Sequence, residues 1–527
     1  MKLSTTTVLG ATVTAAVLAA MVGCTPETAS SADEASSEES TTSTTAQELR
    51  WDDDRRGNDC DDRGPSAARG VKDPGVRGGA PGGGEAVEGL NVNELALYNR
   101  GRFRSIEREA TSEDSNEIPQ GSPVPVPNPG ELTNSAGVGP RFNDTSCTAG
   151  CHAYPAIGGS APFKNPAFDA AKFRGGKNRV PWFETKDGPI REARFLFNED
   201  GTRDGHVHQL FTIEGRRDAA SCKLAQPDFE GNRNNIAFRI PTPLFGMGFI
   251  DGIMDKEILK HKNSNLAKKK KLGIHGHTNN SGNDGTINRF GWKAQNKSMT
   301  QFAGEAYVVE VGISNDLNPQ PTDETDGCLL VNEPADQPHV GLDDDETVTD
   351  RFSDPVNVLP VWMTFVTFMR TLDMPKAARQ DASARRGAVL FEQVGCSECH
   401  TPVMKTRAGI NGAPLTEALR GKEVPLFSDL LVHHMGSNLA DNIIQGGAGP
   451  DEFRSAPLWG VGQRVFFLHD GRTNSLVDAI MAHWSSPTRA KGRTPAYPAS
   501  EANKVVENFA DLSSREQQDV VNFLRTL

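Results

Sequence analysis

Residues 395–402 read GCSECHTP, with two residues between Cys396 and Cys399 and with His400 directly after the second cysteine. This is the attachment pattern of a c-type haem. Two thiols one backbone turn apart can reach the two vinyl groups of the porphyrin, and the adjacent neutral imidazole can bind the iron. The stretch therefore predicts a covalent haem on Cys396 and Cys399, with His400 as an iron ligand.

The residues before this motif, ARRGAVLFEQVG, predict a helix with Gly387 and Phe391 on one face. An earlier stretch, residues 142–152, reads FNDTSCTAGCH and repeats part of the pattern. Both stretches place a phenylalanine five residues before the first cysteine, Phe142 in one and Phe391 in the other. This internal sequence repeat favours two related sites.

The earlier stretch has three residues, not two, between Cys147 and Cys151, and His152 still follows the second cysteine. Gly150 in the spacer tolerates backbone angles that other residues avoid, so one extra residue can loop out. We therefore expect haem on Cys147 and Cys151 as well, with His152 as the iron ligand.

Other interpretations of the odd spacer are a strained disulfide or a zinc site. Zinc needs four ligands, typically two such pairs brought together, but the two pairs here lie far apart in the sequence and each has its own flank. A thioredoxin-like redox pair requires a βαβ context, and the sequence offers none.

The N-terminus has the composition of an export signal. Lys2 precedes an apolar stretch, and AAMVGC ends at Cys24. Small and apolar residues before a cysteine are typical of a lipoprotein-type signal peptide, here residues 1–23, with lipidation of Cys24. Met21 stands where leucine is usual, so plain signal cleavage remains an alternative. We expect an exported protein on the periplasmic side of the cell envelope, held at a membrane by lipid.

Three further cysteines, Cys60, Cys222 and Cys328, remain for an exported chain. An odd number cannot all pair within one chain. We expect a disulfide between Cys222 and Cys328, with Cys60 left in a flexible region.

The 527 residues carry a net charge of -13, which argues against nucleic acid as a partner, because phosphate binding requires excess Lys and Arg. Residues 24–86 are rich in Ser, Thr, Glu and Gly and predict a disordered tether. The single basic run, AKKKK at residues 267–271, is interpreted as a solvated surface segment.

Turn-forming residues and short apolar runs fill residues 87–375, which we assign to an N-terminal haem domain with a large insertion. Within this domain, residues 299–311 predict a helix and residues 361–369 a buried one. Residues 376–527 predict a more helical C-terminal cytochrome c-like domain, whose last helix begins at a capping box of Ser513 and Glu516. The expected fold is mainly α, with two cytochrome c-like haem domains, the first enlarged by loop-rich insertions.

Five blocks of the sequence resemble the bacterial di-haem oxidoreductase family, also called thiol oxidoreductases or peroxidases, which is similar to the di-haem cytochrome c peroxidases. They are FNDTSCTAGCH, RIPTPLFGMGFIDGI, NDGTINRFGWKAQ, FSDLLVHHMGSNLAD and PLWGVGQRVFFLHDGR. They are scattered over about residues 137–485. The three-residue spacer is the main departure from the family pattern.

The resemblance implies one high-potential haem that receives electrons and a second haem where peroxide or another small oxidant reacts. It also implies a His/Met-ligated C-terminal haem, for which Met435 in HHMG is the candidate. A thioether ligand raises the potential of its iron. Met404 and Met481 are the alternatives, and a core methionine is the plain interpretation of Met435.

Analogy with the peroxidases also suggests groups for the reactive haem. Gln301 and Glu305 are four residues apart on the predicted helix and could form a distal pair that transfers protons. His208 could be a distal ligand or proton donor, although a buried structural imidazole accounts for it equally well. His469 in FLHDGR is interpreted as structural. Trp292 and Trp459 could bridge the haems, or simply pack in the core.

Related peroxidases often hold calcium between their haem domains. The segment HTNNSGNDGT offers Asn279, Asn283 and Asp284 as oxygen donors. Turn formation accounts for the same composition. Calcium is therefore a possible cofactor beside the two haem groups.

The sequence favours an exported di-haem enzyme of peroxidase type that takes electrons from a small donor protein, a cytochrome or cupredoxin. The alternatives are a non-catalytic di-haem or monohaem electron carrier and a binding protein with structural haems. Thiol–disulfide exchange is disfavoured, because thioether bonds would consume the cysteine pairs.

Overall fold

The computed structural model describes residues 64–108, 138–171, 178–212, 221–319, 328, 359–408 and 416–527. Residues 1–23, predicted as a signal peptide, lie outside these ranges, as do Cys24, Cys60 and most of the predicted tether. Across the described ranges, no helix has the length and apolar character needed to cross a membrane. The disulfide predicted between Cys222 and Cys328 is confirmed.

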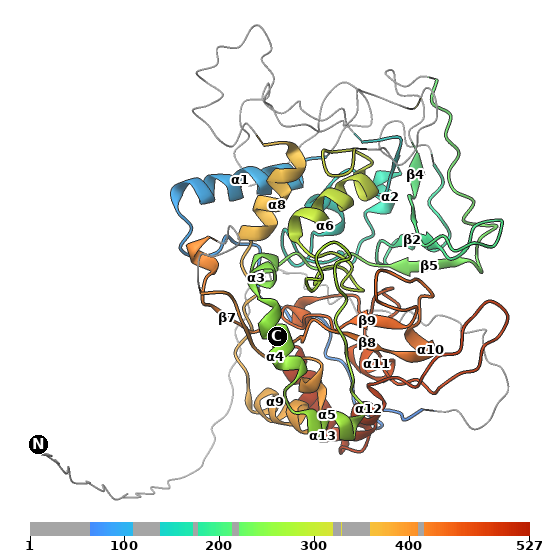
Figure 1. The fold of residues 1–527 in the computed structure, drawn as a ribbon. Helices are drawn as coiled ribbons and strands as arrows, with labels where there is room; N and C mark the ends of the chain where they lie inside the picture. Colours follow the sequence, from blue (N-terminus) through green and yellow to red (C-terminus); the bar gives the residue numbers. More distant parts are fainter. Residues whose placement is uncertain are drawn as a thin grey trace, which may run out of the picture. The chain divides into compact units, whose positions relative to one another are not determined.

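Four helices form the core of the N-terminal half: α1 (Val92–Ile106), α3 (Met247–Gly252), α6 (Met299–Ala306) and α8 (Val361–Thr371). α1 and α8 lie side by side (Figure 1) because Gly101 lets the backbones approach: a Cβ there would lie 2.0 Å from the Thr364 carbonyl oxygen. The buried helix predicted at residues 361–369 is therefore confirmed as α8. The helix predicted at 299–311 is also confirmed, but α6 changes at its end into a π-helix, η4 (Tyr307–Val311).

Strands are short, two to four residues each. β2 (Glu192–Phe195) is the middle strand of an antiparallel sheet, between β3 (Val207–His208) and β5 (Ile236–Arg239). Three further antiparallel pairs complete the ladders: β1 (Arg141–Phe142) with β4 (Phe211–Thr212), β6 (Met404–Lys405) with β7 (Glu423–Val424), and β8 (Val432–His434) with β9 (Glu452–Arg454). Helices therefore dominate the regular structure, as predicted, and long loops connect them.

The C-terminal half is built on α9 (Ala382–Val394) and α13 (Ser514–Leu524), which pack against each other. Gly387 and Phe391 both face this contact, as the sequence predicts. A Cβ at Gly387 would lie 1.9 Å from the Asp519 carbonyl oxygen, and the rings of Phe391 and Phe523 lie 5.5 Å apart. The predicted capping box of Ser513 and Glu516 is present at the start of α13.

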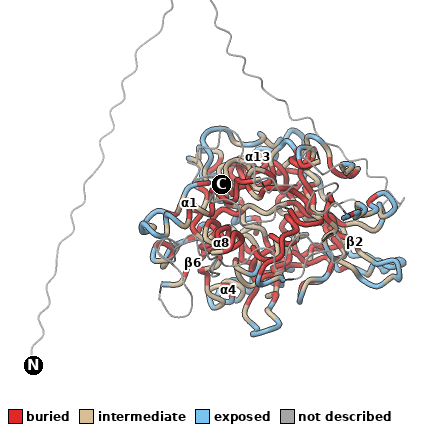
Figure 2. Tube along the Cα trace, turned by 90° about the horizontal axis from the view of Figure 1, so that it is seen from above, coloured by how far each residue is buried: buried red, intermediate tan, exposed pale blue. Residues whose placement is uncertain are grey.

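Shorter elements complete the described chain: α2 (Ala167–Ala170), α4 (Asp255–Lys262), α5 (Leu266–Leu272), α10 (Gly436–Leu439), α11 (Leu476–Met481), α12 (Asn503–Ala510), and the single turns η2 (Cys147–Cys151), η6 (Cys396–Glu398), η7 (Glu417–Leu419) and η8 (Val461–Gln463). Buried residues gather in the interior, and exposed residues follow the outer loops (Figure 2).

The predicted domain boundary at residue 375 does not separate the two halves. α5 contacts α12 (Figure 1), and His277 pairs with Val432 of β8, so residues from the middle of the chain belong to the C-terminal packing. The two halves are interleaved, because the insertion after α3 runs into the C-terminal half and returns to α6.

Residues 64–86, predicted as part of the tether, are folded against the protein. The Asp73 carboxylate accepts two 2.7 Å bonds from the Arg525 guanidinium, and Gly82 N donates to Gln463 Oε1 at 2.9 Å. This correction has a physical reason: the segment is held by hydrogen bonds and an ion pair, which its low hydrophobicity could not reveal.

Candidate haem sites

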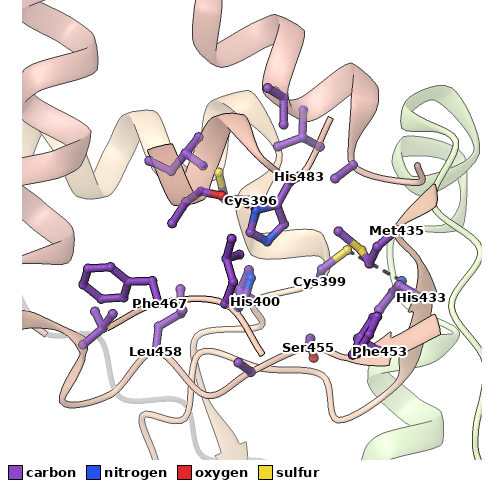
Figure 3. A pocket seen from close by; sticks show the side chains of 18 of the residues that line it. Cys396, Cys399, His400, His433, Met435, Phe453, Ser455, Leu458, Phe467 and His483 are labelled. Atoms are coloured by element: carbon purple, nitrogen blue, oxygen red, sulfur yellow. Dashed lines mark hydrogen bonds between the residues drawn. The ribbon is translucent and has the colours of Figure 1, made fainter. Parts of the chain in front are cut away.

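The C-terminal cysteine motif opens into an apolar cavity of about 1490 Å³, including its open mouth (Figure 3). Cys396, Cys399 and His400 lie in its wall, and apolar side chains of α9, α11, α12 and α13 and of residues 453–469 form much of the remaining surface. A planar apolar cofactor requires such surroundings, because apolar area leaves water on binding.

The loop that carries the motif is fixed at both ends. α9 ends at Gly395, whose φ of 109° only glycine adopts easily, and His400 N donates to the Cys396 carbonyl at 2.9 Å. The His400 ring contacts the Phe427 carbonyl through Nδ1 at 3.1 Å, which leaves Nε2 available to a metal. Burial, with the nearby His483 adding to it, lowers the pKa of His400 to about 4. The ring is therefore neutral at physiological pH, as an iron ligand must be.

The two thiols of this site are protonated in the absence of a cofactor. Burial raises the pKa of Cys396 to about 12 and raises that of Cys399 as well. Thiol–disulfide exchange requires a thiolate, so these thiols are poorly suited to it. The finding agrees with the expectation that the cysteines attach a cofactor.

Of the three methionines considered as second ligands, only Met435 lines this cavity, where it faces the motif (Figure 3). Met404 is fully buried in the N-terminal core, and Met481 packs against the cluster around Phe391. His469 also lies in the cavity wall, but its ring is stacked on Phe453 at 4.3 Å, which fits the structural role predicted for it.

His483 is a further candidate ligand that sequence reasoning missed. It lines the same cavity (Figure 3), and its Nδ1 contacts the Ala479 carbonyl at 2.6 Å, which leaves Nε2 available. A lone histidine at the end of a short helix carries no motif, so only the fold brings it close to His400.

A buried cation that lies over the Trp292 ring supports the fit of a haem to this cavity. Arg464 lines the wall, and its Nε and Nη2 atoms are buried without a hydrogen-bond partner among the described residues. Burial lowers its pKa to about 10, so it remains charged. A buried guanidinium is stable when a carboxylate pairs with it, and the propionate groups of a haem would supply that carboxylate.

The N-terminal motif shows how the extra spacer residue is accommodated. Cys147–Cys151 forms a π-helical turn, η2, and His152 N donates to the Cys147 carbonyl at 2.9 Å. The second motif makes the equivalent bond from His400 to Cys396, also at 2.9 Å. The longer turn therefore absorbs one residue and keeps the histidine bonded to the first cysteine.

The three residues between Cys147 and Cys151 pack against the protein and do not bulge into solvent. Thr148 Oγ1 lies 2.9 Å from Ser105 Oγ at the end of α1, and Ala149 N donates to Ser146 Oγ at 3.1 Å. Gly150 packs on the Asp144 carboxylate, where a Cβ would lie only 2.3 Å from Oδ2. Glycine is therefore required in the spacer by close packing.

The His152 ring, like the His400 ring, is neutral at physiological pH. Its Nδ1 lies 3.3 Å from the Gly159 carbonyl, and burial lowers its pKa to about 4. The cavity beside it, about 1370 Å³ with its open mouth, is lined by Cys147, Cys151 and residues of α6, η4 and α8. The donors and the space again fit a haem.

Carboxyl groups are more numerous in the wall of the N-terminal cavity than in that of the C-terminal cavity, to which Glu501 contributes. Glu310, Glu305 and Asp144 all line the N-terminal cavity. Burial, with repulsion from Glu192 adding to it, raises the pKa of Glu310 to about 8, and Asn143 Nδ2 donates to Glu310 Oε2 at 2.6 Å. Glu310 is therefore a partly buried acid that holds a proton at neutral pH. Sequence reasoning missed it because helical periodicity puts it on a different face from Glu305; the π-helix brings both to the cavity.

Of the three residues predicted for proton transfer, Glu305 lines the N-terminal cavity, whereas Gln301 and His208 do not. Glu305 lies in the cavity wall and accepts a 2.6 Å bond from Asn296. Gln301 is exposed and does not line the cavity, so the predicted pair with Glu305 is not formed there. His208 lies outside the cavity, where it bonds Asp204 at 2.8 Å and stacks on Phe195, which supports the structural interpretation.

Trp292 is common to the walls of both cavities. Its indole N–H donates to the Ile240 carbonyl at 2.9 Å, which fixes the ring. Trp459 is buried in the N-terminal core and lines neither cavity. The structure therefore distinguishes the two tryptophans that the sequence left equivalent.

The predicted calcium donors do not converge. Asn279 is buried and bonds the Lys293 and Gln445 carbonyls, whereas Asp284 pairs with Lys297 at the surface. No metal-binding group of three His, Cys, Asp or Glu residues occurs in the part of the chain that the structure describes. The segment forms a turn, as its composition also allowed.

Comparisons with known proteins agree with this chemistry. Residues 207–524 match the family described as "Di-haem oxidoreductase, putative peroxidase". This range includes the second cysteine motif and Glu310 but not the first motif. No curated protein matches the chain.

Two solved structures resemble parts of the chain. A hydrazine synthase chain of Kuenenia stuttgartiensis is 19% identical, with a TM-score of 0.18, and the match covers 33% of this chain and 55% of that one. The chain thus spans about half the length of that relative. A MauG-like protein associated with microbial copper homeostasis is 15% identical, with a TM-score of 0.24, over 55% of this chain and 91% of that one. Because the family match extends over more than half of the sequence, the chain belongs to the di-haem oxidoreductase family.

Proposed function

We propose that the protein is a di-haem peroxidase that carries a covalent c-type haem on each cysteine motif. The observation that carries this proposal is the pair of cavities, each with two cysteines and a neutral histidine, that share Trp292. When bound, the haems would supply irons that exchange single electrons and, at the N-terminal site, react with peroxide.

The C-terminal site is suited to receiving electrons. His400 offers a neutral imidazole, and Met435 offers a thioether in the same cavity. Such a ligand pair favours the reduced metal and raises its potential. Arg464 would hold a propionate and so fix the orientation of the cofactor.

The N-terminal site is suited to proton transfer. Reduction of one peroxide to two waters consumes two electrons and two protons. Glu310 holds a proton at neutral pH beside the cavity, and its hydrogen bond from Asn143 fixes one carboxyl oxygen. Glu305 and Asp144 are further acids in the wall, so protons can be replaced from neighbouring groups. General acids of this kind typically contribute about 10²–10⁴-fold to a rate.

Trp292 is the proposed link between the two sites, because its fixed ring belongs to both walls. A pure electron carrier would need no acids at its second site. The carboxyl groups around the N-terminal cavity therefore favour the enzyme over the carrier.

Export and lipid attachment at Cys24 belong to the same proposal. Cytochrome c maturation and a disulfide between Cys222 and Cys328 both fit an oxidising compartment. A small electron-donor protein would then supply the two electrons.

Anaerobic titration tests the proposal. The fully reduced holoprotein is mixed with hydrogen peroxide, and the absorbance of each haem is followed. One peroxide should oxidise two electron equivalents per chain, and Trp292→Phe should slow oxidation of the C-terminal haem at unchanged haem content. Two haems that reduce normally but ignore peroxide would establish the carrier instead.

A further inference from the structure

A strongly basic surface element lies in the middle of this acidic chain. α4 and α5 with the turn between them, residues 255–272, contain seven lysines against two carboxylates, a net charge of +5 in a chain of net charge -13. We call these residues the basic hairpin. Its charge is opposite in sign to the net charge of the full sequence.

The basic hairpin is a fixed surface and not a solvated tail. Lys269 is buried, and its Nζ donates to the carbonyls of His261 and Lys262 at 2.6 and 3.3 Å, which caps the end of α4. Gly273 ends α5 in the left-handed conformation. The remaining lysines are therefore held in place on a folded surface.

Its outer face combines charge with exposed apolar side chains. Lys256, Lys260, Lys268, Lys270 and Lys271 are exposed. Among them, Leu259 is 41% and Leu266 60% exposed. Apolar residues surrounded by charges are typical of protein–protein contact surfaces.

The inner face of the basic hairpin touches the C-terminal cysteine motif. Leu272 and Ile274 pack against Cys396 and Cys399. Lys268 Nζ forms a 2.9 Å ion pair with Glu398, which lies between the two cysteines. One layer of side chains therefore separates the basic surface from the proposed haem attachment, and a molecule docked there would be close to the cofactor.

We propose that the basic hairpin docks an acidic redox protein, which delivers electrons to the C-terminal site; this rests on the proposed function. The basic hairpin attracts an acidic partner, so its concentrated positive charge both speeds and orients the approach. Each encounter passes one electron, with the donor oxidised and the C-terminal site reduced by one electron. Two encounters supply the two electrons for one peroxide.

Stopped-flow reduction of the oxidised holoprotein tests the docking. The probe is reduced flavodoxin, a small acidic redox protein, and the variant is K270E/K271E. The control, K164E/K186E, reverses two neighbouring exposed lysines in the N-terminal half. K270Q/K271Q removes the same charges without introducing acids at the end of α5. Circular dichroism and haem content verify that each variant is folded and loaded.

At low ionic strength the second-order rate constant should fall about tenfold or more in K270E/K271E, less in K270Q/K271Q, and less than about twofold in the control. The steep salt dependence of the wild type should flatten in K270E/K271E. Equal losses in control and hairpin variants, or no loss in either, would overturn the proposal.

Two further measurements separate donor docking from a damaged redox centre and from membrane binding. Dithionite reduction and reoxidation by peroxide should be unchanged in K270E/K271E; their absence in the wild type would instead contradict the proposed function. Vesicles of phosphatidylcholine with phosphatidylglycerol test the membrane as an occupant. Vesicle binding that depends on Lys270 and Lys271, with an unchanged flavodoxin rate, would assign the surface to anionic lipid and reject the donor.

Discussion

Glu310 is a partly buried side chain for which we propose a role in proton transfer and expect a cost in stability. Its ordinary pKa is 4.5, and burial raises it to about 8. The folded protein therefore keeps a proton that the unfolded chain releases above about pH 4.5. Since the unfolded state binds fewer protons between these two values, the free energy of unfolding falls as the pH rises from about 4.5 to about 8.

Glu310→Gln should separate these two roles. We expect peroxide turnover to fall about 10²-fold or more, because glutamine cannot donate the proton. The wild type should lose activity above about pH 8 as Glu310 ionises, and the variant should lack this limb. Thermal unfolding should show a shallower decline from about pH 5 to about pH 8 in the variant, measured beside the surface control Glu507→Gln. Unchanged turnover would remove Glu310 from the mechanism.

Met435 makes a second prediction at the residue scale. Met435→Leu should lower the midpoint potential of the C-terminal haem by a measurable part of the roughly 0.8 V that axial ligands span. Spectroelectrochemical titration measures it, with Met481→Leu as the control outside the cavity. An unchanged potential and spectrum would favour His483 as the second ligand.

At the scale of elements, the two cysteine turns differ in helical type but close with the same hydrogen bond. η6 is a 3-10 turn of three residues, and η2 is a π-helical turn of five residues with one more residue between its two cysteines. Each ends with a histidine N–H bonded to the carbonyl of the first cysteine, at 2.9 Å in both. The packing of Thr148 on Ser105 and of Gly150 on Asp144 holds the longer turn.

Gly150→Ala should damage this turn selectively. The new Cβ would lie 2.3 Å from the buried Asp144 carboxylate, so one of the two must move. Overpacking of this kind costs about 1–3 kcal/mol. We expect haem content to fall toward one per chain by pyridine haemochrome assay. Gly282→Ala, where no atom lies within 4 Å of the new Cβ, should keep full loading. Equal loading of both variants would show that the packing is not required.

Sequence patterns identified those parts of the fold and of the candidate site that depend on residues close together in the sequence. The cysteine motifs, the capping box of α13, the buried helix α8 and the disulfide from Cys222 to Cys328 follow from residue types at short spacing or from simple pairing. Glu310, His483 and Arg464 could not be found this way. Each gains its role from contacts between distant segments, and the π-helix η4 breaks the periodicity from which the position of Glu310 would be predicted.

At the scale of the whole molecule, segments far apart in the sequence hold the halves together. Residues 64–86 lie against the C-terminal half through Asp73 and Arg525, and the backbone of Val87 bonds Thr371 at the end of α8. The sequence of such a polar segment predicts a tether, because its stability comes from specific partners rather than from apolar burial.

Asp73→Asn should therefore destabilise the protein well beyond a surface change. Both side chains of the Asp73–Arg525 pair are nearly buried, at 7% and 5% exposure, so the variant leaves a buried guanidinium without its counter-charge. Loss of one partner of a buried pair costs about 3–5 kcal/mol. Denaturant unfolding measures the change, with Glu507→Gln at the exposed Lys504 pair expected within about 0.5 kcal/mol of the wild type. Equal stability of the two variants would show that residues 64–86 contribute little.

The number of covalent haems per chain tests the central claim most directly. The protein is produced with a cytochrome c maturation system and measured by pyridine haemochrome absorbance and intact mass. We predict two haems in the wild type and one in each of C147S/C151S and C396S/C399S. A single haem in the wild type, retained in C147S/C151S and lost in C396S/C399S, would show that the π-helical turn is not a haem site and would contradict the two-haem account.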